Sequence, residues 1–113
     1  MATVDDVREI VRDLPRSHEV LVRDRMKFRV GSIVYVAFSR DETVMGFGYP
    51  KEQRASLVAS DPATFLMPSA SNLRFHWVEA RLDALDRDEL TELVLDAWRM
   101  VVPKKVAREH LGG

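Results

Sequence analysis

The sequence predicts an α+β fold in two layers, an antiparallel β-sheet with its helices on one face. Apolar residues recur every three or four positions near both ends of the chain, which indicates helices there. In the middle of the chain apolar and polar residues alternate between short turn signals, which indicates antiparallel strands. With 113 residues the chain suits a single domain spanning residues 1–113, in the order helix, three strands, helix, strand, helix.

The first helix is expected over residues 4–14, because its apolar side chains have helical spacing. Thr3 can cap its start, with Asp6 in the first turn, and Pro15 ends it. The helix therefore has a signal at each end as well as an apolar stripe for the core.

Three strands follow, joined by short turns. Gly31-Ser32 lies between residues 26–30 and 33–39, a pattern typical of a two-residue hairpin. Residues 40–43 form the next turn, which leads into a strand at 44–49.

The second half of the chain begins with a short helix at Pro50, whose fixed φ suits a first helical position. The remaining elements are a loop, a strand and a long helix, expected at residues 63–72, 76–82 and 86–102. Asp86 and Glu89 form a capping box for the long helix. Pro103 can end this helix or open a short final one.

The turn at Gly31-Ser32 predicts which strand residues share a face, because side chains alternate along a strand. An uncharged face, expected to meet the helices, carries Met26, Phe28, Val30, Ile33, Tyr35 and Ala37. The opposite face carries Arg25, Lys27, Arg29, Val34, Val36 and Phe38. If Asp41-Glu42 is also a two-residue turn, Val44, Gly46 and Gly48 join the helix side, while Met45, Phe47 and Tyr49 join the basic side. From the last strand the outward residues are Trp77, Glu79 and Arg81.

This outward face combines cations with aromatic rings, which suits a nucleic-acid strand because cations meet phosphates and rings stack on bases. The candidate binding residues for DNA or RNA are Arg25, Lys27, Arg29, Phe47, Tyr49, Trp77 and Arg81. Glu79 is the one carboxylate on this face, and an ion pair with Arg81 is the simplest expectation for it.

Two alternatives remain open for the same face. It can be covered by a protein partner or by a second copy of the chain, as in a chaperone-like adaptor or a homodimer. It can also border a small-ligand pocket near Trp77, Tyr49 and the loop at residues 65–72.

Composition and motifs exclude several other classes. The net charge of −1 means that any attraction to nucleic acid has to be local. The absence of cysteine rules out disulfides and thiolate metal sites, and the three histidines lie far apart without ligand spacing. No catalytic or phosphate-binding motif is present, so neither an enzyme, a metal nor a cofactor is expected. No secretory signal or membrane-spanning stretch is found, and the expected location is the cytoplasm.

Several short segments, in this order and spacing, resemble the MmcQ/YjbR family over nearly the whole chain. They are Leu14-Pro15, Lys27-Phe28-Arg29-Val30-Gly31, Tyr49-Pro50 before Lys51-Glu52-Gln53-Arg54, Asp61-Pro62 with Phe65, His76-Trp77-Val78 and Asp96-Ala97-Trp98. The resemblance implies a fold similar to type III secretion chaperones and a DNA-binding label, with no catalytic residues to carry over. The chain departs from the family between residues 16 and 25, where no glycine occurs, so the first strand starts early or the hairpin shifts.

Overall fold

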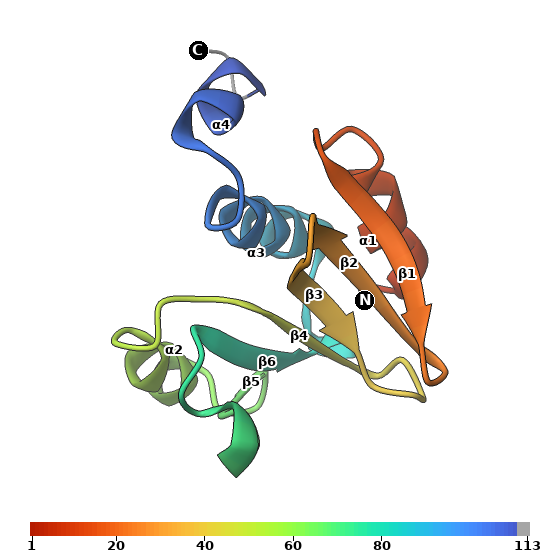
Figure 1. The fold of residues 1–113 in the computed structure, drawn as a ribbon. Coiled ribbons are helices and arrows are strands. Elements are labelled where there is room, and N and C mark those ends of the chain that lie inside the picture. The colour runs from red at the N-terminus through yellow and green to blue at the C-terminus, as the bar shows by residue number, and fades with distance from the viewer. Residues whose placement is uncertain (111–113) are drawn as a thin grey trace.

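One antiparallel sheet of six strands organises the chain, in the order β1-β2-β3-β4-β6-β5 (Figure 1). The computed structural model describes residues 1–110. The strands are β1 (Ser17–Val22), β2 (Arg25–Val30), β3 (Ile33–Phe38), β4 (Val44–Gly48), β5 (Phe65–Leu66) and β6 (Trp77–Arg81). The helices are α1 (Val4–Val11), α2 (Arg54–Ser60), α3 (Arg87–Arg99) and α4 (Lys104–His110), with 3₁₀ turns η1 (Ala70–Asn72) and η2 (Leu82–Ala84).

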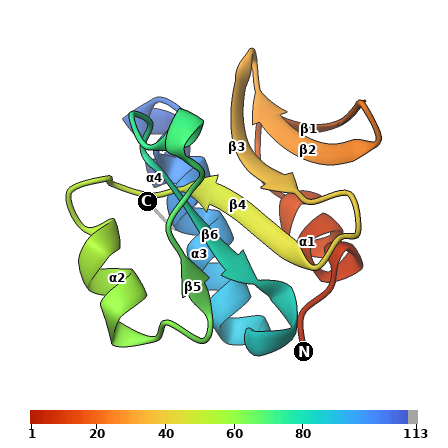
Figure 2. The same ribbon diagram turned by 90° about the horizontal axis from the view of Figure 1, so that it is seen from below.

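The predicted fold class is confirmed, and the chain has more strands and helices than expected. β1 and the two-residue β5 are additional strands, and Pro103 opens α4. Helix α2 begins at Arg54, since the residues after Pro50 form a turn first. Helices α1 and α3 pack together on one face of the sheet, while α2 lies beside β5 (Figure 2).

The helix starts follow directly from the sequence. The Thr3 hydroxyl accepts a hydrogen bond from the Asp6 amide at 3.2 Å, and the Asp6 carboxylate accepts one from the Thr3 amide at 2.9 Å. Asp86 and Glu89 form the same reciprocal pair at the start of α3. Each capping box satisfies backbone N–H groups that would otherwise lack a partner.

The glycine-free segment before β2 folds as a tight turn between β1 and β2. Arg23 and Asp24 both adopt positive φ, 52° and 65°, as the preferred two-residue hairpin turn requires. In the next hairpin Gly31 supplies the positive φ, and Val30 pairs with Ile33 as predicted. The hairpin has therefore not shifted, and the segment forms a separate edge strand.

A bulge in β3 reverses part of the predicted face assignment. Arg29 pairs with Val34 but Phe28 pairs with Val36, so Tyr35 has no partner across the ladder. One extra residue turns every later side chain to the opposite face. The prediction was therefore wrong for Val36, Phe38, Met45 and Phe47, which are buried in the core, and for Ala37, Val44 and Gly46, which lie on the other face.

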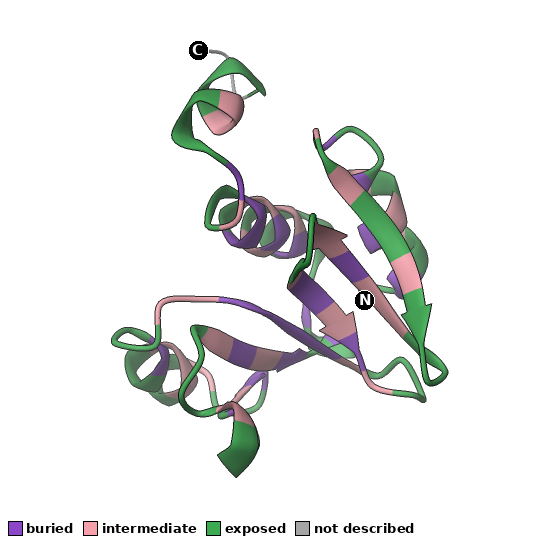
Figure 3. Cartoon of the chain, viewed as in Figure 1, coloured by how far each residue is buried: buried purple, intermediate pink, exposed green. Residues whose placement is uncertain are grey.

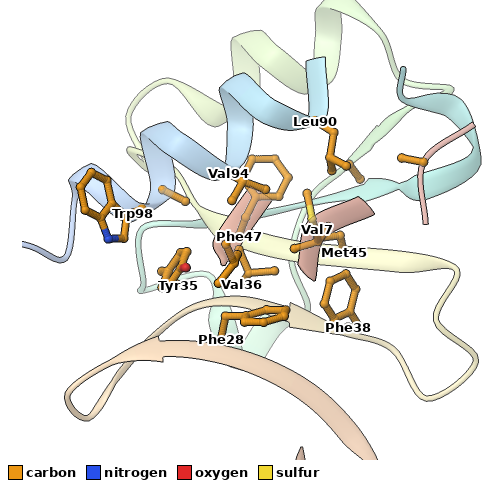
Figure 4. Packing of buried hydrophobic residues seen from close by; sticks show 14 of the residues in the cluster. Val7, Phe28, Tyr35, Val36, Phe38, Met45, Phe47, Leu90, Val94 and Trp98 are labelled. Carbon is orange, nitrogen blue, oxygen red and sulfur yellow. The ribbon is translucent and has the colours of Figure 1, made fainter. Parts of the chain in front are cut away.

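The core lies between the sheet and helices α1 and α3. Figure 4 shows Met45 and Phe47 of β4 between the sheet and Leu90 and Val94 of α3, all four fully buried. Trp98 closes one end of this core, and its indole N–H donates a hydrogen bond to the carbonyl of Pro15 at 3.0 Å.

Tyr35 also lies in the core, beside Trp98 (Figure 4). Its hydroxyl is hydrogen-bonded to the hydroxyl of Ser17 on β1. Burial raises the pKa of Tyr35 to about 12, because the phenolate would be poorly solvated there.

Within residues 1–110, none of the helices has the length and the apolar character that crossing a membrane requires.

Candidate functional site

A groove of about 720 Å³ runs along the face of the sheet that α1 and α3 leave uncovered, here called the open face. Strands β2, β3, β4 and β6 supply its floor and one wall. The segment before β6 and the end of α3 close it on other sides, through Asn72, Phe75, His76, Met100 and Val101. The volume lies within the range of about 300–1,000 Å³ typical of small-ligand sites.

Two cations line the β2 side of the groove, as the alternation in β2 predicted. Arg25 is exposed and Lys27 is half-buried. Among residues 1–110, neither side chain has a carboxylate within ion-pair distance. Both charges are thus available to a ligand.

Aromatic rings lie on the β6 side. The Trp77 indole is half-buried and lies over Gly46 of β4, so closely that a Cβ added to Gly46 would be 2.6 Å from the indole nitrogen. Glycine at this position is what lets the ring lie against the strand. Phe75 is 50% exposed, and the Arg74 guanidinium lies 4.7 Å from its ring centroid.

The segment carrying these rings is held by a buried arginine. Arg54, only 7% exposed, donates hydrogen bonds to the carbonyls of Leu73, Phe75 (2.9 Å) and Trp77 (3.1 Å). The Lys51 amide adds a bond to His76 Nδ1 at 3.0 Å. The start of α2 thereby fixes the wall of the groove that precedes β6.

Glu79 is the carboxylate that lines the groove. It is half-buried, opposite Gly46 on β4 and Leu66 on β5. Burial raises the pKa of its carboxyl group. The expected ion pair with Arg81 is absent within the described residues, because the Arg81 guanidinium instead donates to the Ala63 carbonyl at 2.8 Å.

The structure brings together only part of the predicted binding set. Arg25, Lys27 and Trp77 line the groove. Arg29 lies on the same face but donates to His18 Nε2 at 3.0 Å, and Tyr49 packs edge-on against Phe47, with ring centroids 6.3 Å apart.

Phe47 is a correction to that set. It is 0% exposed, because the β3 bulge turns it into the core, so it cannot meet a ligand.

Trp77 belongs to the predicted set, but the residues just before it do not. Arg74-Phe75-His76-Trp77 alternates cationic or polar groups with rings, although Arg74 and Phe75 precede the strand expected at residues 76–82. Arg54 had no such signal, because its partners lie 19 to 23 residues further along the chain.

The groove does not present a familiar catalytic arrangement. Among residues 1–110 no three His, Asp or Glu side chains form a group that could hold a metal ion. The groups in the groove that could recognise a ligand are separated in space: cations lie on one side, aromatic rings on the other and a carboxylate on the floor.

Comparisons with known proteins agree with this architecture. The family model described as YjbR matches residues 12–100. The crystal structure of Deinococcus radiodurans protein DR2400, with the domain DUF419, superposes with a TM-score of 0.79 at 27% identity, covering 99% of this chain and 89% of that one. No match is found among curated proteins.

Proposed function

This chain belongs to the YjbR family, and we propose a function for it from the groove itself. The open face binds a short single-stranded segment of DNA or RNA. The observation that carries this proposal is that two cations without carboxylate partners and the Trp77 ring line one cavity.

The charges around the groove favour a polyanion. Arg25 and Lys27 lie on one side, and Arg74 stacks on Phe75 at the other. Cations on both sides can hold successive phosphates of a strand, even though the net charge of the whole chain is −1. The attraction is local, as the composition requires.

The rings and the shape favour a single strand over a duplex. Trp77 and Phe75 offer surfaces on which splayed bases can stack, and stacking contributes about 1–3 kcal/mol per base. The bases of a duplex are already stacked on one another and cannot enter a groove of about 720 Å³.

The test is fluorescence anisotropy with a labelled single-stranded hexamer of mixed sequence, titrated between 20 and 200 mM salt. Two phosphate contacts give a salt slope near −1.4, so affinity should fall about 25-fold over this tenfold range. Lys27→Glu with Arg25→Glu should abolish most of that dependence. Trp77→Ala should weaken binding by about 5- to 150-fold.

The matched control is Arg12→Glu, a charge reversal at the exposed end of α1, on the covered side of the sheet. This substitution changes the net charge by the same amount as Lys27→Glu alone but leaves the groove intact. The Arg12→Glu variant should therefore bind the hexamer like the wild type. Equal losses in Arg12→Glu and Lys27→Glu would mean that global charge, and not the groove, determines binding.

A second function has one specific observation in its favour. β1 is an edge strand with an exposed apolar end, where Leu21 is 66% exposed (Figure 3). Such an edge can add a strand from a partner protein or from a second copy. Light scattering from 1 to 200 μM tests self-association, which Leu21→Glu should remove if β1 mediates it.

A further inference from the structure

We propose that Glu79 makes the groove selective for bases that carry an exocyclic amino group, such as cytosine, over uracil and thymine. This inference rests on the proposed binding of a single strand in the groove. It assigns a specific role to the one groove residue whose charge opposes phosphate binding.

The position of Glu79 separates it from the phosphate contacts. It lies on β6, two residues from Trp77, while Arg25 and Lys27 belong to β2. Strands β3 and β4 lie between them in the sheet. A base stacked on Trp77 therefore has its edge near Glu79 while its phosphate reaches toward the β2 cations.

The Glu79 carboxylate lacks a donor of its own. Throughout residues 1–110, no hydrogen bond or ion pair is formed with it. It is nevertheless half-buried, and this burial raises the pKa of its carboxyl group. A ligand N–H donor would replace lost hydration and lower that pKa again.

The surrounding charges decide which donor fits. Arg25 and Lys27 line the same groove, and Arg74 lies against Phe75. A cationic ligand would be repelled by these groups, whereas a phosphate would be repelled by Glu79 if placed beside it. A neutral N–H donor on an anionic backbone satisfies both constraints.

Among bases, cytosine offers such a donor at N4, and carboxylates accept hydrogen bonds from this group. Uracil and thymine place a carbonyl oxygen there, which would face the carboxylate lone pairs. The amino group is therefore the feature that Glu79 discriminates.

The experiment compares three single-stranded DNA hexamers by anisotropy at pH 7.5 and 50 mM salt. They contain deoxycytidine, deoxyuridine, or N4,N4-dimethyldeoxycytidine, which keeps the cytosine ring but lacks the N4 hydrogens. The wild type should bind the cytidine hexamer about 5- to 50-fold more tightly than either of the others. Glu79→Gln should reduce this ratio to less than about threefold.

Glu52→Gln is the matched control, because this substitution removes the same charge as Glu79→Gln. Glu52 is an exposed carboxylate that lies 3.9 Å from His76. It should retain the wild-type preference. The three ligands also test the wild type directly, so the result does not depend on the folding of a variant.

The outcomes separate this inference from the proposed function. If all three hexamers bind equally, with the salt dependence described above, single-strand binding stands and selection by Glu79 is refuted. If Glu52→Gln loses the preference as Glu79→Gln does, the selection comes from overall charge and the inference fails. If no hexamer binds below about 1 mM, both proposals fall.

Discussion

Replacing Arg54 with methionine tests how the wall of the groove is held. Methionine keeps an unbranched stem of similar length but removes the hydrogen bonds to the carbonyls of Leu73, Phe75 and Trp77. A hydrogen bond from a charged group contributes about 1.5–3 kcal/mol. Burying the guanidinium itself is costly, and this cost disappears in the variant.

The net expectation is a loss of about 2–3 kcal/mol in the free energy of unfolding. The carbonyls of exposed Leu73 and Phe75 can reach water in the variant, which limits the loss. For a domain of this size, each kcal/mol lowers Tm by about 4 °C, so the variant should melt about 8–12 °C lower. Urea titration followed by far-UV circular dichroism measures the free energy directly.

Hydrogen exchange gives a local readout of the same substitution. The Lys51 amide is bonded to His76, in the segment that Arg54 holds, and should lose protection before the amides between β4 and β6. Arg54→Lys keeps the charge but not the planar fork, and should recover only part of the stability.

The surface control is Arg99→Met, which removes an exposed pair with Asp96 and should cost less than about 0.5 kcal/mol. If Arg54→Met melts within about 2 °C of the wild type, the segment holds itself and the role given to Arg54 is refuted.

Three further substitutions probe the sheet. Gly46→Ala should displace the Trp77 indole, increase acrylamide quenching of its fluorescence and cost about 1–3 kcal/mol, whereas Gly48→Ala, whose added Cβ meets nothing closer than 3.7 Å, should be tolerated; equal behaviour of the two would contradict the packing described. Because the pKa of Tyr35 is raised to about 12, its contribution to stability, about 3 kcal/mol, is fully present below pH 10 and lost as the pH rises through 12. The pH profile of Tyr35→Phe should lack this decline. Arg23→Asn should stabilise the protein by about 0.5–1 kcal/mol in urea titration, since asparagine tolerates the positive φ of 52° better; an unchanged midpoint would show that the turn carries no strain.

Local signals predicted much of the fold. The capping residues Thr3 and Asp86 mark the two main helices, and Gly31 marks the central hairpin. These features depend on residues within one turn of one another, so the sequence contains the whole cause. Arg25 and Lys27 were placed correctly because they alternate with apolar residues in β2.

The β3 bulge was not predictable in the same way. From Ile33 to Phe38 every residue is apolar, so no polar side chain marks the outward face. An extra residue therefore leaves no trace in the hydrophobic pattern, although it reverses everything that follows. Tertiary packing of Phe28 and Val36 on one side selects the register.

The missing parts of the candidate site have a related cause. The wall before β6 depends on Arg54, whose contacts join α2 to a segment far along the chain. Phe47 was misplaced only because the bulge was unseen. Assignments that depend on long-range contacts fail together, whereas those on β2 stand.

Tyr35 has no backbone partner across the ladder, so the alternation of core and open-face residues changes by one position within β3. This strand therefore joins two parts of the sheet with opposite alternation. For protein engineering this defines a unit of exchange. A chimera with the Deinococcus radiodurans protein should cross over outside β2 and β3, so that both strands come from one parent. Losing one residue within β3 would turn Val36, Phe38 and Met45 toward water. It would also bring Ala37, the partner of Lys27, and Gly46, the partner of Ala37, into the core. The fold therefore depends on the number of residues in β3 as well as on their identities.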